Sequence, residues 1–140
     1  MIVREQHVAL VVKEISAGAE DPQHVASLVG AFIQVQPTVG HYVSAHSKEL
    51  GLEGVVLTLL HAAVLTRCIE TAAGRRMRAV RFEDLDVAAK SSAPLSESEP
   101  ELAGYLSSNI STEDATLGGK RRELALKLLD VVGRALLDRR

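Results

Sequence analysis

Five histidines and one cysteine are the side chains of this 140-residue chain best suited to bind a metal ion or attack a substrate. His41 and His46 are five residues apart. On an ideal helix this is a rotation of about 140°, so one helix cannot aim both rings at the same ion. Carboxylate di-iron bundles need inward-facing Glu-x-x-His twice, and the chain has no such pair. We therefore expect no metal and no cofactor.

His61 and Cys68 share a helix face but are separated by about 10 Å of helical rise, which is beyond the reach of a Cys–His dyad. His46 and His61 both fall on apolar faces, where a histidine is usually hydrogen-bonded inside the core. A lone cysteine there usually packs as a small hydrophobe. The sequence predicts that the protein is not an enzyme. One alternative is a small helical enzyme or ligand carrier with an interhelical pocket near His46 and His61, and pairing of Cys68 with His24 or His41 also stays open.

Apolar residues in the first part of the chain recur at helical spacing. The first stripe covers residues 8–15. The second covers 25–33 and follows Asp21-Pro22, a cap and a residue suited to the first helical turn. The third covers 39–50, and Gly51 is expected to close it. These patterns predict three successive helices.

A fourth stripe, roughly Leu52 to Ala73, is apolar nearly all round, which is typical of a helix enclosed by others. We expect it to be the hub of the fold and to stop at Gly74. Its charge-free run from Gly54 to Thr66 is too short to cross a bilayer, and the N-terminus lacks the basic-then-apolar order of a signal peptide. No contact with a membrane is expected.

The second half of the chain has shorter and more polar elements. A short helix is expected after Phe82, and the polar, Pro-containing residues 91–100 predict a flexible linker or exposed loop. A brief helix follows, and Lys120 to Leu137 have the pattern of a long helix that docks on the first half. The sequence thus predicts a single domain over residues 1–140, a compact all-α bundle of five to seven helices around residues 52–73.

The composition agrees with a soluble domain in a reducing compartment. The chain is 46% hydrophobic and can build a core without metal or disulfide staples. The single Cys68 excludes an internal disulfide and favours the cytoplasm. The net charge of -2 is too small to draw the whole molecule to nucleic acid or membranes.

Charge is nevertheless zoned along the chain. Residues 66–81 and 120–140 each carry a balance of +4, whereas residues 82–119 carry -7. In one interpretation the acidic zone folds against the basic zones, with little energy for each exposed pair. In the other, basic residues form a patch for a binding partner. The residues of that predicted patch are Arg75, Arg76, Arg78, Arg81, Lys120, Arg121 and Arg122.

The residues around the predicted patch favour a protein partner with an acidic surface. Nucleic-acid binding usually recruits aromatic stacking or a recognition helix, and Phe82 is the sole aromatic beside the arginines. Arginine, in contrast, is enriched at the hot spots of protein interfaces. The sequence therefore predicts a non-catalytic protein–protein interaction module, a small adaptor, regulator or immunity-type protein. A nucleic-acid-binding subunit of a larger complex is the alternative, and wide apolar stripes on the fourth and last helices predict a homo-oligomer, most simply a homodimer.

Overall fold

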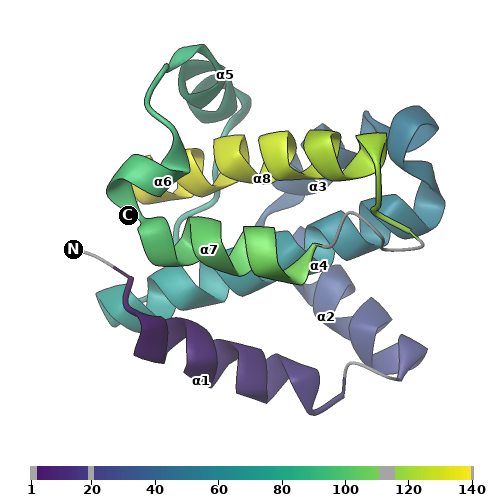
Figure 1. Ribbon diagram of the computed structural model, residues 1–140, viewed down its shortest axis with the longest axis horizontal. Coiled ribbons are helices and arrows are strands. Elements are labelled where there is room, and N and C mark those ends of the chain that lie inside the picture. Colours follow the sequence, from purple (N-terminus) through teal and green to yellow (C-terminus); the bar gives the residue numbers. More distant parts are fainter. Residues whose placement is uncertain (1–2, 19–20, 111–115, 140) are drawn as a thin grey trace.

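The computed structural model describes residues 3–18, 21–110 and 116–139, which form eight helices and no strand (Figure 1). The helices are α1 (Glu5–Ser16), α2 (Pro22–Val35), α3 (Pro37–Ser44), α4 (Ser47–Ala73), α5 (Phe82–Lys90), α6 (Leu95–Ser98), α7 (Pro100–Asn109) and α8 (Lys120–Arg139). The predicted all-α bundle is confirmed. The described residues contain one helix more than the predicted five to seven, because residues 95–98 form the short helix α6.

The long apolar helix α4 is the centre of the bundle, as predicted. It packs against α1, α2, α3, α7 and α8, with α1 and α2 on one side and α8 on the other (Figure 1). Leu59, Leu65 and Ile69 of α4 are buried. Among the described residues α4 is the one helix long and apolar enough to cross a membrane, but 56% of its apolar window is buried inside the protein. Such burial is typical of a core helix.

Glycines with positive φ interrupt and end α4. Gly51 has φ 75° and kinks the helix after its first turn, and Gly74 has φ 71° and ends it. A side chain would be strained at both positions, which is why glycine occupies them. The helix predicted over residues 39–50 is therefore wrong in one respect: α3 already ends at Ser44, and Leu50 belongs to the first turn of α4.

The helices α4 and α8 run side by side in the same direction. A Cβ placed on Gly51 would lie 3.5 Å from Nη2 of Arg121, and one placed on Gly133 would lie 3.7 Å from Cδ1 of Leu65. The start of α8 therefore lies at the start of α4. The predicted docking of the last helix on the first half of the chain is confirmed, and α5 packs on α8 in turn.

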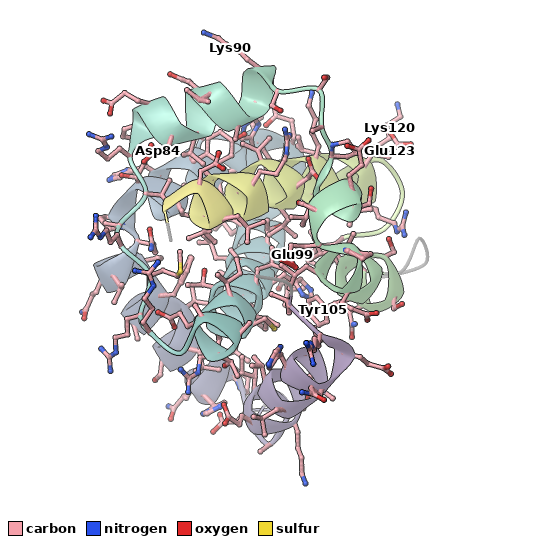
Figure 2. All side chains as sticks on the ribbon, turned by 90° about the vertical axis from the view of Figure 1, so that its left-hand side faces the viewer. Asp84, Lys90, Glu99, Tyr105, Lys120 and Glu123 are labelled. Atoms are coloured by element: carbon pink, nitrogen blue, oxygen red, sulfur yellow. The ribbon has the colours of Figure 1, made fainter. Side chains whose placement is uncertain are left out.

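Residues 91–100 differ from the exposed loop that the sequence predicts. They include α6, and the side chains of Leu95 and Glu99 are buried. Both carboxylate oxygens of Glu99 accept from the Val3 amide, at 2.7 and 3.2 Å. Figure 2 shows Glu99 inside the bundle, where it joins this segment to the residues that precede α1.

Candidate protein-binding groove

The structure does not bring the seven predicted patch residues together. Arg121 lies beside Gly51, near the start of α4, whereas Arg75 follows the end of that helix. The helical residues between these points span about 33 Å at 1.5 Å per residue. Figure 2, which is turned by 90°, also shows a separation: Lys120 lies on the opposite side of the view from Asp84, which accepts from the Arg81 amide. The basic residues form two groups.

The group at the start of α8 is partly used inside the protein. Arg122 donates through Nε to the Ile110 carbonyl at 2.6 Å and through Nη2 to the Ser107 carbonyl at 3.3 Å. Because these carbonyls lie at the C-terminal end of α7, Arg122 satisfies acceptors that the helix itself leaves unpaired. Arg121 donates to the Thr116 carbonyl at 3.3 Å, and Lys120 is exposed.

The group after α4 lies on an extended segment held down by a buried glutamine. Gln36, at the junction of α2 and α3, donates through Nε2 to the Arg78 carbonyl at 2.9 Å and accepts from the Val80 amide at 2.8 Å. The segment also buries Met77 and Val80 in the core. Between these two buried residues the side chain of Arg78 is exposed.

Ion pairs engage only part of this group. Arg81 lies 3.5 Å from Glu83 and 3.7 Å from Asp84, so the start of α5 offsets its charge. No ion pair between described residues involves Arg75, Arg76 or Arg78, and all three side chains are exposed. Among the described residues, contact between the acidic zone and this basic zone therefore accounts for Arg81 and provides no ion pair for the other three arginines.

An open groove of about 340 Å³ lies between α1, α2 and α4, and Arg76 stands at its edge. We call it the α2–α4 groove. Its apolar lining comes from all three helices, and its polar lining includes two arginines and two glutamates. The lining residues are Glu14, Ile15, Leu28, Ala31, Phe32, Val35, Gln36, Ala63, Thr66, Arg67, Glu70 and Arg76.

A second, shallower hollow of about 330 Å³ continues the groove past the end of α4. It is lined by Arg75 and Gly74 and shares Arg67, Glu70 and Arg76 with the groove. We call Arg67, Arg75 and Arg76 the arginine rim. Arg67 lies within the basic zone of the sequence, but nothing in its spacing distinguishes it from any other exposed helix residue.

The rim carries net positive charge next to an apolar surface. Arg67 and Glu14 are 4.0 Å apart with both side chains about half exposed, a geometry that contributes little energy. One oxygen of Glu70 accepts from the Met77 amide at 2.8 Å and so also fixes the extended segment. Val35 is 54% exposed on the groove wall. The surface offers an incoming group both apolar area and positive charge.

The residues considered for catalysis lie outside the lining of the groove, and His46, His61 and Cys68 are packed against aromatic residues or buried in the core. The Nδ1 atom of His61 and the Tyr105 hydroxyl form a hydrogen bond of 2.8 Å. Burial raises the pKa of Cys68 to about 12, so the sulfur is held as a neutral thiol, which is a poor nucleophile. His46 precedes α4 and packs edge-on against Tyr42. Among the described residues no three His, Cys, Asp or Glu side chains gather as a metal site would require.

Another hollow, of about 430 Å³, lies between α5, α6 and α8, and the sequence does not predict it. Its polar lining is mixed, with Glu97, Glu99 and Asp138 facing it together with Arg134. Arg134 pairs with Asp130 at 2.8 Å and donates to the Ser91 carbonyl at 3.1 Å. These bonds tie the start of the 91–100 segment to α8, so Arg134 has a structural role here.

No protein-family model, curated protein or solved structure matches the chain.

Proposed function

We propose that this protein is a non-catalytic protein–protein interaction module, an adaptor, regulator or immunity-type protein, which binds an acidic partner at the α2–α4 groove. The observation that carries the proposal is the position of Arg75 and Arg76, which are exposed and form no ion pair with a described residue, beside an open groove with a largely apolar lining. Interfaces draw their affinity from desolvated apolar anchors and arginines, and charge complementarity mainly sets the association rate and the choice of partner. The groove supplies both kinds of contact within one surface.

Of the seven predicted residues, the proposal keeps those on the exposed segment that follows α4, where Arg76 lines the groove, Arg75 lines its continuation and Arg78 lies two residues further along the chain. Arg75, Arg76 and Arg78 are assigned to partner binding. Arg81 and Arg122 are assigned to the fold, because their side chains bond to the start of α5 and the end of α7. Basic residues in the first half of α8, Lys120, Arg121 and Lys127, then provide an internal control with the same charge away from the groove.

The test is affinity capture from native lysate at two salt concentrations, followed by mass spectrometry. The variant Arg75→Ala/Arg76→Ala/Arg78→Ala should bind the partner at least about ten-fold more weakly than the wild type, which corresponds to a loss of about 1.4 kcal/mol in binding free energy. Its helicity and melting temperature should stay unchanged, because the three side chains are exposed. The matched control Lys120→Ala/Arg121→Ala/Lys127→Ala removes the same charge and should capture the partner normally.

Three outcomes contradict the proposal. Equally reduced capture by the two triple variants would mean that only the net charge of the protein matters. Loss in the control alone would place the interaction at the start of α8. Recovery of nuclease-sensitive RNA or DNA that falls steeply with salt would instead favour the nucleic-acid-binding alternative.

A further inference from the structure

The walls of the α2–α4 groove have the length of two helical turns. Leu28, Phe32 and Val35 follow one another along α2 at helical spacing, and the lining residues of α4 run from Ala63 to Glu70. Each wall therefore extends about 10 Å along its helix axis. The small side chains of Ala31 and Ala63 leave the space between the walls open. Two turns of a ligand helix would place side chains at i, i+3 or i+4, and i+7 over the same length.

The other common ways of binding a peptide find little support at this surface. Strand addition needs a free sheet edge, and the described residues contain no strand. Recognition of a polyproline helix needs an aromatic-lined groove, and the one aromatic lining residue, Phe32, is only 8% exposed. A helix, which satisfies its own backbone and binds through side chains, suits walls that are themselves helices.

The charges define which helix fits. Arg67 stands beside the apolar lining, and Arg75 and Arg76 extend the positive rim beyond the end of α4. Acidic side chains next to the apolar anchors of the ligand would meet this rim, whereas basic ones would be repelled. We infer that the partner segment is an acidic amphipathic helix that lays its apolar face into the α2–α4 groove and directs Asp or Glu toward the arginine rim. This inference rests on the proposed function, because it specifies the ligand of the same groove.

The probe is a fluorescently labelled synthetic peptide of about 16 residues, long enough to form measurable helix. It carries Leu at i, i+4 and i+7, Glu on one flank and Ala elsewhere. One matched peptide replaces every Glu with Lys, and another carries two central prolines, which break the helix. Fluorescence anisotropy should show binding of the acidic helical peptide, and binding of the other two should be at least about ten-fold weaker.

Protein variants locate the binding site. Val35→Glu places a like charge on the exposed groove wall and should weaken binding of the acidic peptide at least about ten-fold. The matched control Val87→Glu makes the same change at an exposed valine of α5, outside the groove lining, and should bind as the wild type does. Circular dichroism should show both variants folded, because both positions are solvent-exposed.

The results separate this inference from the proposed function. Equal binding of the proline peptide, or unchanged binding by Val35→Glu, would overturn the helix-in-groove inference. So would tighter binding of a phosphoserine peptide without apolar anchors, or absence of binding at millimolar acidic peptide. In each case the proposed function stands if capture of the native partner still requires Arg75, Arg76 and Arg78. If capture does not require these arginines, the proposed function is overturned together with the helix-in-groove inference.

Discussion

Replacing Gln36 with Met should destabilise the protein far more than the same change two residues earlier in the chain. Gln36 is fully buried and bonds to both the Val80 amide and the Arg78 carbonyl, at 2.8 and 2.9 Å. Methionine has a similar size and flexibility but can make neither bond. The variant therefore leaves a backbone donor and a backbone acceptor without their partners while the apolar packing changes little.

The expected magnitude follows from the burial of the two backbone groups. The Val80 amide belongs to a buried residue, and a buried unsatisfied donor costs about 1–3 kcal/mol. Arg78 is exposed, so water can partly replace the bond to its carbonyl, and we add about 1 kcal/mol for it. The sum, about 2–4 kcal/mol, is a large part of a typical stability of about 5–15 kcal/mol. At about 4 °C per kcal/mol, the melting temperature should fall by about 8–16 °C.

Urea unfolding followed by circular dichroism measures this loss, with Gln34→Met as the matched control. Gln34 is exposed on α2, so its replacement should change the free energy of unfolding by less than about 0.5 kcal/mol. Hydrogen exchange gives a local readout, because the Val80 amide should lose protection in Gln36→Met. If the two variants were equally stable, or the Val80 amide stayed protected, the role assigned to Gln36 as the anchor of the arginine segment would be refuted.

Three further predictions concern other parts of the molecule. Arg122→Ala should lower the free energy of unfolding in urea by about 1.5–3 kcal/mol, because it removes a charged donor 2.6 Å from the Ile110 carbonyl. Partner capture should stay intact. Loss of capture without loss of stability would contradict the structural role of Arg122. Burial raises the pKa of Cys68 to about 12, so the unfolded chain releases that proton first. The free energy of unfolding should then fall between about pH 9 and 12, and a Cys68→Ala variant should show a shallower fall; identical slopes would contradict the assignment. If the predicted homodimer forms through the side of α4 that carries Leu52, which is 81% exposed, Leu52→Glu should sediment as a monomer with an unchanged melting temperature. If the variant sedimented like the wild type, this side of α4 would be excluded as the dimer interface.

Local signals in the sequence were sufficient for most of the helices. Asp21 accepts from the Gln23 amide at 3.0 Å and caps α2, as the Asp-Pro pair predicts. Gly74 ends α4 with a positive φ. Each of these features depends on the geometry of a few neighbouring residues, so composition and spacing along the chain predict them. The break between α3 and α4 was missed because neither Ala45 nor His46 is a helix breaker.

Contacts between distant segments could not be predicted in the same way. The buried side chain of Gln36 bonds to a segment more than forty residues later, and that of Glu99 to the Val3 amide. In the sequence, Gln36 is only the residue before a proline, and Glu99 is one acid in a polar stretch. Their importance comes from the burial of their side chains, which depends on how the helices pack.

The sequence by itself determined that this protein is an all-α bundle around α4, because hydrophobic spacing and glycine stops act over a few residues. It also determined that positive charge is concentrated in two parts of the chain. Only the tertiary structure decided that these parts lie apart, since the parallel packing of α4 and α8 brings Arg121 to Gly51 and leaves Arg75 at the far end of α4. The groove beside Arg76 likewise exists only because α1, α2 and α4 pack around small side chains. The number of charges in a segment does not say where in the molecule they lie, because their positions depend on how the helices pack.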